Sequence, residues 1–158
     1  MVSAKIVRQF ALAAGAAMAL LVSVPASAKD VQLFSPDQVA GFAGNSSSMP
    51  GARHFKIMGH DGKEVVATKV WLPANSDFPP HGKVEQGKAT SVFVLSGDLQ
   101  LGMGDKFDEG QLKSTPVGSV IVLTPDNATH FARTGAKPVE LLLIQSFAGD
   151  FARELKLQ

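Results

Sequence analysis

Cysteine and tyrosine are both absent from this 158-residue sequence, and it contains only one tryptophan. Without cysteine, the chain can form no disulfide bond, and it offers no thiol nucleophile or cysteine ligand for a metal. Without tyrosine, a phenolic acid or base is excluded as well. The stability of the fold must therefore come from a hydrophobic core. Any chemistry at a site must use histidine, carboxylates, lysine or hydroxyl groups.

Charged residues are sparse too, at 18% of the chain, and the formal net charge is +1. Lys5 and Arg8 belong to an N-terminal segment that we expect to be removed, which changes the charge to +1 − 2 = −1. A nearly neutral chain without a basic block gives no electrostatic basis for binding nucleic acid or an anionic membrane. We therefore expect neither of these partners.

The first 28 residues have the pattern of an export signal. Lys5 and Arg8 give a basic start, Ala11–Val24 is a short apolar run, and Pro25–Ala28 ends in the A-x-A pattern of a signal peptidase site. The apolar run is shorter than the roughly 20 residues that a membrane-spanning helix needs. We therefore expect a cleaved signal peptide over 1–28, a periplasmic or secreted protein, and no membrane association after cleavage.

The remaining residues, 29–158, have the size of one domain and read mostly as short strands. Ser35-Pro36-Asp37 predicts a short N-terminal helix, because a capping serine precedes a proline and an acid in the first turn. From His54 onward, about nine runs of β-branched and aromatic residues alternate with turns rich in glycine and proline. This spacing predicts an all-β sandwich or barrel.

Three local features refine this expectation. Pro73 and the pair Pro79-Pro80 bracket a predicted loop. Ser96-Gly97 predicts a hairpin between the strands on either side of it. The nearly continuous apolar stretch Leu141–Ile144 predicts a strand that is buried at the centre of a sheet.

Most of this domain carries an ordered set of motifs. In chain order they are Phe78–His81, Val94–Gly97, Gly102–Asp108, and the spaced residues Gly118, Pro125 and His130. Between Trp71 and Phe147, this order resembles the cupin superfamily, and especially small exported single-domain cupins. The resemblance implies a cupin jelly-roll barrel of antiparallel strands, here over about 53–147. It also implies a divalent metal ion held inside the mouth of the barrel.

The metal motif itself is only partly kept. In cupins the first motif supplies His-x-His and a later Glu, and the second motif supplies one more His. His81 and His130 match two of these positions, whereas Lys83 stands at the second histidine position and Thr90 at the glutamate position. Glu85 comes too early to match the glutamate by spacing, and it can serve as a third ligand only if the lengthened loop folds inward.

These residues allow several interpretations. In one, the barrel binds a small organic ligand through His81, Lys83, Thr90 and His130, and the lysine ammonium attracts a carboxylate or another anion. In another, His81, His130 and Glu85 hold one divalent metal ion in an oxygenase- or isomerase-type enzyme, which is an inference from fold analogy. The two histidines could also have a purely structural role. An ammonium repels a metal cation, and we therefore favour ligand binding.

A further hypothesis makes the barrel an interaction module. The tail Phe151–Leu157 alternates like an edge strand. An edge strand leaves backbone groups free to pair with another chain. A homodimer formed through this tail is therefore a third expected role.

Overall fold

A computed structural model describes residues 33–59 and 62–147 of the chain. The expected signal peptide and the tail Phe151–Leu157 lie outside these residues. From Phe34 onward, the described residues belong to one compact unit. No helix in the described part is long and apolar enough to cross a membrane.

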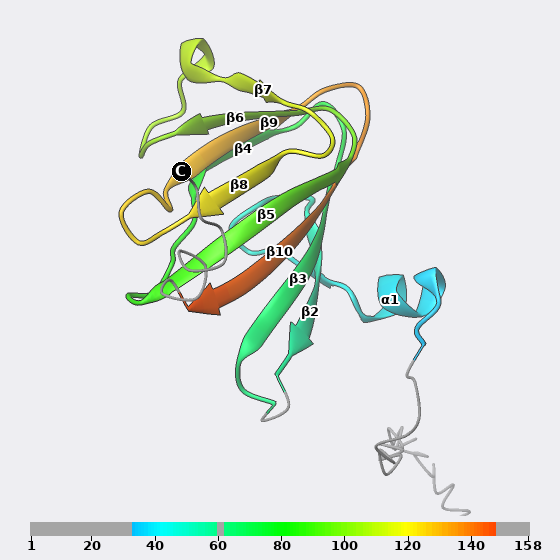
Figure 1. Ribbon diagram of the computed structural model, residues 1–158. Helices are drawn as coiled ribbons and strands as arrows, with labels where there is room; N and C mark the ends of the chain where they lie inside the picture. The colour runs from blue at the N-terminus through cyan, green and yellow to red at the C-terminus, as the bar shows by residue number, and fades with distance from the viewer. Residues whose placement is uncertain (1–32, 60–61, 148–158) are drawn as a thin grey trace, which may run out of the picture. The chain divides into compact units, whose positions relative to one another are not determined.

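The described unit consists of one short α-helix, a 3₁₀ turn and ten strands (Figure 1). The strands form two antiparallel sheets, with the orders β1-β2-β3-β10-β5-β8 and β4-β9-β6-β7. The elements are α1 (Pro36–Phe42), β1 (Gly44–Asn45), β2 (Arg53–Met58), β3 (Val65–Leu72), β4 (Asp77–His81), β5 (Lys88–Ser96), β6 (Leu99–Met103), η1 (Glu109–Gln111), β7 (Lys113–Thr115), β8 (Val120–Leu123), β9 (His130–Thr134) and β10 (Val139–Phe147). This is the all-β architecture with a short N-terminal helix that the sequence predicts.

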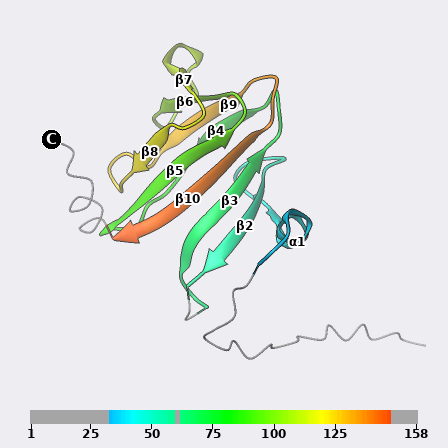
Figure 2. The same cartoon turned by 45° about the vertical axis from the view of Figure 1, so that its right-hand side comes forward.

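The helix α1 begins at the residues that the sequence indicates. Ser35 is the N-cap, and its Oγ accepts a hydrogen bond from the backbone N–H of Gln38 at 3.3 Å. The Gln38 side chain accepts one in return from the Ser35 N–H at 2.9 Å, which completes a capping box. The ring of Phe42 stacks on that of Phe55 in β2 with centroids 6.3 Å apart. This contact helps to hold α1 against β2, and Figure 2 shows the helix beside that strand.

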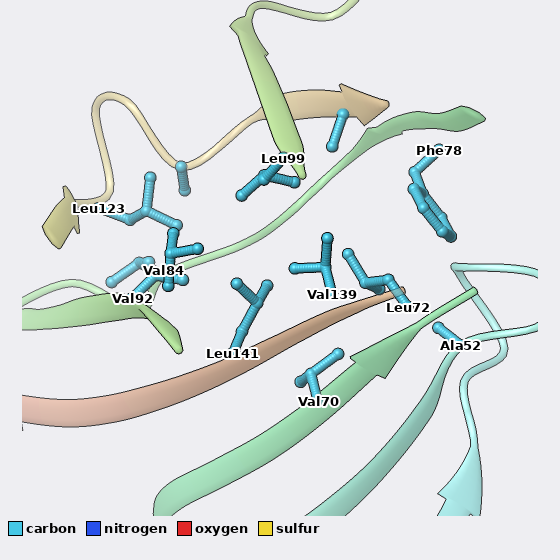
Figure 3. Packing of buried hydrophobic residues seen from close by; sticks show 13 residues of the cluster. Ala52, Val70, Leu72, Phe78, Val84, Val92, Leu99, Leu123, Val139 and Leu141 are labelled. Atoms are coloured by element: carbon cyan, nitrogen blue, oxygen red, sulfur yellow. The ribbon is translucent and has the colours of Figure 1, made fainter. Parts of the chain in front are cut away.

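The core lies between the two sheets. Leu99 from the four-stranded sheet faces Val139 and Leu141 from the six-stranded sheet (Figure 3). Phe78 of β4 is completely buried in this cluster. Burying a side chain of this size contributes about 1.5–3 kcal/mol to stability, so the inner faces of the strands account for much of the cohesion between the sheets.

The segment that carries His81 is a strand, and the expectation of a loop up to the proline pair is wrong. β4 contains both Pro79 and Pro80, and it pairs with β9 at the edge of the four-stranded sheet. Proline cannot donate a backbone hydrogen bond, but an edge strand tolerates it where that group would face away from the sheet. The pairing register shifts between Phe78 and His81, where the prolines interrupt the ladder. The proline pair therefore marks a sheet edge.

The predicted hairpin at Ser96-Gly97 is also wrong. β5 pairs with β10 and β8 in one sheet, whereas β6 pairs with β7 and β9 in the other. Gly97 has a φ of +87°, and a Cβ there would lie 2.1 Å from the carbonyl oxygen of Pro138. The turn is therefore a tight corner that carries the chain from one sheet to the other.

The strand β10 lies between β3 and β5, as the apolar run predicts for a central strand. Its burial nevertheless alternates. Val139 and Leu141 are buried, whereas Ile144 is 39% exposed. The strand is central in pairing but covered on one face only, because the core lies on one side of the six-stranded sheet.

Candidate functional site

A cavity of about 180 Å³ lies between the two sheets. Among the described residues, its polar lining side chains are those of His81, Lys83, Thr90 and His130. The remaining lining residues are apolar or glycine, and none of them is an aspartate or glutamate. The structure thus brings to one cavity all four residues that the sequence indicates for ligand binding.

Strand pairing brings the two histidines together. His81 ends β4 and His130 begins β9, and the two residues are direct partners in the antiparallel register. Their ring centroids are 4.4 Å apart with the planes inclined by 57°. Directly opposed residues in antiparallel strands have side chains on the same face of the sheet. The register therefore places both imidazoles at the same end of the cavity.

Backbone hydrogen bonds fix the tautomer of each imidazole. His81 Nδ1 lies 2.7 Å from the carbonyl oxygen of Pro79, and His130 Nδ1 lies 2.7 Å from that of Ala128. A carbonyl oxygen can only accept, so Nδ1 carries the proton in both rings. In the neutral rings, Nε2 is then the nitrogen with a free lone pair. Each histidine can offer this atom to a ligand.

Gly82 permits the close approach of the two histidine strands. Its φ is +102°, and a Cβ there would lie 2.3 Å from the carbonyl oxygen of Ala128 and 2.9 Å from His130 Nδ1. Glycine is the one residue that fits both the dihedral angle and the available space. Sequence reasoning did not identify Gly82 as part of the site, although it stands between His81 and Lys83. The only sign of this role in the sequence is that a glycine directly follows His81.

Burial affects the protonation of His130. Removal from water lowers the pKa of this imidazole, and the nearby His81 ring lowers it further. The hydrogen bond to Ala128 opposes these two effects. His130 is therefore neutral at pH 7, which leaves its Nε2 as a hydrogen-bond acceptor.

Lys83 and Thr90 add a charge and a hydroxyl to the cavity lining. Lys83 follows β4, is exposed, and forms no ion pair with any described residue. Thr90 lies in β5, on the opposite sheet, and is half-buried. The polar groups at the cavity therefore come from both sheets, and the one formal charge among them is positive.

Glu85 does not join this group. Its carboxylate forms an ion pair with Lys88 at 3.3 Å, and its side chain is 70% exposed. Lys88 also pairs with Glu64 at 2.9 Å. Glu85 lines a different surface depression and is not among the residues around the cavity. The loop that follows His81 thus carries this carboxylate away from the two histidines.

A divalent metal centre needs more ligands than this cavity offers. Catalytic sites use three protein ligands and an open position. Within the described part of the chain, no group of three or more histidine or acidic side chains is placed to hold a metal ion. His81 and His130 supply two imidazoles, and the lysine at the same cavity donates hydrogen bonds only and repels a cation. The described residues do not fit a three-ligand metal centre.

The sequence matches no protein-family model and no curated protein. Its fold does match solved structures. The polyketide cyclase RemF from Streptomyces resistomycificus is similar with a TM-score of 0.52 and 19% identity, over 73% of this chain and 78% of that one. A predicted oxalate decarboxylase from Thermotoga maritima is similar with a TM-score of 0.51 and 14% identity, over 73% and 99%.

A cupin domain of Cnp3 from Schizosaccharomyces pombe also matches, with 13% identity over 69% of this chain and 70% of that one and a lower TM-score of 0.48. At these identities the similarities show the fold alone. Together with the two antiparallel sheets, the two matches with TM-scores above 0.5 support the jelly-roll fold that the sequence resemblance predicts for the described unit. At two of the positions where the cupin motif would place metal ligands, this sequence has Lys83 and Thr90.

Proposed function

We propose that this cupin-fold protein binds a small organic ligand in the cavity between its sheets, without depending on a divalent metal. The observation that carries the proposal is the composition of the cavity lining. Four polar side chains gather at a space whose other described lining residues are apolar or glycine. A mainly apolar pocket with a few convergent polar groups is the usual form of a small-molecule site, because the apolar walls give affinity and the polar groups give orientation.

A metal-dependent enzyme is the second candidate, and one observation favours it. The Nδ1–H groups of His81 and His130 both donate to backbone carbonyls, which leaves Nε2 to act as a ligand. This is the usual arrangement around a metal-binding histidine. Two such imidazoles alone would bind a divalent ion weakly, since the described residues supply no third histidine or carboxylate.

Elemental analysis separates the two candidates. The protein is purified without chelators and without a nickel column, and its metal content is compared with that of His81→Ala. His54→Ala serves as the matched control, because His54 lies in β2 and does not line the cavity. We expect well below one metal ion per chain, with no difference between the three proteins. Nearly stoichiometric metal that is lost specifically in His81→Ala would overturn the metal-independent proposal.

We also propose that the mature protein acts outside the cytoplasm. The support is the basic start, the apolar run and the A-x-A pattern within residues 1–28. Cell fractionation followed by determination of the N-terminal residue tests this. A mature chain that begins at Lys29 in the exported fraction is the expected result, and a full-length cytoplasmic chain contradicts it.

A further inference from the structure

The charge at the cavity defines one property of the ligand. Lys83 has no acidic partner among the described residues, whereas Lys69 pairs with Glu140 at 3.2 Å and Lys88 pairs with Glu64 at 2.9 Å. No aspartate or glutamate is among the described residues that line the cavity. An ammonium next to an apolar cavity without a nearby carboxylate attracts an anion and repels a cation. The ligand is therefore expected to carry a negative group, and a carboxylate matches a single ammonium.

The two imidazoles define a second property. Their Nδ1–H groups are occupied by the carbonyl oxygens of Pro79 and Ala128. Neither Nε2 has a hydrogen-bond partner within the described part of the chain. The centroids of the two rings, which line the cavity, lie 4.4 Å apart. The Nε2 of a neutral imidazole accepts a hydrogen bond. A ligand that satisfies this atom must carry a donor, and a hydroxyl group next to the carboxylate is the simplest one.

The size of the cavity defines the third property. Its volume of about 180 Å³ is slightly more than the roughly 150 Å³ of an apolar cavity that accommodates benzene. Leu72, Val92 and Leu141 are among the buried side chains that form its walls. A hydrocarbon group the size of one six-membered ring fills this space. The polar groups of the ligand then lie beside the exposed Lys83.

We infer that the cavity binds a hydroxy-carboxylate with a single ring-sized apolar group: the carboxylate faces Lys83, the hydroxyl donates to an imidazole Nε2, and the apolar group packs between the sheets. This inference rests on the proposed ligand-binding function and names the class of ligand. Thr90, on the opposite sheet, offers a hydroxyl as a further hydrogen-bond donor to the carboxylate. A ligand with several rings would extend beyond the ring-sized space between the sheets.

Three probes test the class by removing one group at a time. Mandelate carries the ring, the hydroxyl and the carboxylate, phenylacetate lacks the hydroxyl, and benzyl alcohol lacks the carboxylate. Their affinities are measured by isothermal titration calorimetry, with each enantiomer of mandelate titrated separately. Methyl NMR spectra of the cavity leucines and valines show whether the probe enters the cavity. A hydrogen bond to a charged group is typically worth about a tenfold change in affinity. We expect the better enantiomer of mandelate to bind about tenfold more tightly than benzyl alcohol, which lacks the charged group, and severalfold more tightly than phenylacetate, which lacks only a hydrogen bond between neutral groups.

Substitution of Lys83 connects the carboxylate preference to its residue. Lys83→Met should reduce the affinity for mandelate to about that for benzyl alcohol, and leave the affinity for benzyl alcohol nearly unchanged. Lys137→Met is the control, since Lys137 is an exposed residue that does not line the cavity. If all three probes bind equally well, or if Lys83→Met leaves mandelate binding intact, the inference about ligand class is overturned and the cavity remains a binding site. If no probe binds or shifts the cavity methyl signals, the proposed function is overturned with it.

Discussion

The substitution Gly82→Ala tests whether close backbone packing holds the two histidines together. Gly82 has a φ of +102°, a region that disfavours residues with a Cβ. A residue held in such a sparsely populated region costs about 1–3 kcal/mol. The new methyl group would also lie 2.3 Å from the Ala128 carbonyl oxygen, a distance that real Cβ contacts do not reach. Either the chain near Ala128 must move, or the end of β4 must separate from β9.

The movement should break a specific hydrogen bond. The Ala128 carbonyl oxygen accepts from His130 Nδ1 at 2.7 Å, and a neutral hydrogen bond of this kind contributes about 0.5–1.5 kcal/mol. Added to the backbone strain, the loss predicts a destabilisation of about 2–4 kcal/mol for Gly82→Ala. Urea unfolding measures this value. Long-range ¹H–¹⁵N NMR spectra of the imidazoles show which ring nitrogen of His130 carries the proton. We expect that the proton is no longer held on Nδ1 in the variant.

Gly87→Ala provides the matched control. Gly87 also has a positive φ, +77°, but no heavy atom lies within 4 Å of the position that a Cβ would take. This variant carries the dihedral strain, about 1–2 kcal/mol, without the collision. If both variants lose the same stability and His130 keeps its tautomer in both, the reasoning that close packing at Gly82 builds the site is refuted.

Two further predictions concern charged residues around the barrel. Arg133 in β9 donates hydrogen bonds to Asp77 in β4 and lowers the pKa of this carboxyl below its ordinary value. The stability that this pair contributes is present above the pKa of Asp77 in the unfolded chain, and it is lost as the pH falls through the lower pKa of the folded protein. Asp77→Asn should therefore reduce the loss of stability between pH 5 and pH 3 in urea titrations, and an unchanged pH profile would contradict the assignment. Glu85→Gln should leave probe binding and metal content unchanged, since Glu85 pairs with Lys88 outside the cavity. A marked loss of probe binding or of metal would show that Glu85 is a ligand after all.

Local patterns in the sequence were sufficient for most of the fold. The helix start at Ser35 could be predicted because a capping box depends on residues three positions apart. The central position of β10 could be predicted from its apolar run. The corner at Gly97 could not be predicted from the sequence. A tight turn has the same sequence pattern whether its two strands pair with each other or belong to different sheets. The approach of Pro138 that decides the geometry comes from a residue about forty positions away.

The same distinction applies to the site. The order of the motifs in the sequence identified His81 and His130 as candidate site residues. The register of β4 and β9 places these two residues opposite each other. Glu85 was harder to place because the direction of a loop side chain depends on its partners, and the pair with Lys88 holds it outside the cavity. The role of Gly82 was not visible at all. It depends on the carbonyl of Ala128, which reaches this position only after the strands have paired.

The departures from the cupin metal motif do not lie at random in the structure. Lys83 and Thr90 both line the cavity that His81 and His130 line. A histidine and a glutamate at those two positions would complete a site for a cation, because both supply lone pairs and the glutamate adds a negative charge. A lysine and a threonine at the same cavity supply hydrogen-bond donors and a positive charge instead. Under the proposed function, these two side chains make the cavity favour an anion, whereas the histidine and glutamate of the cupin motif would make it favour a cation.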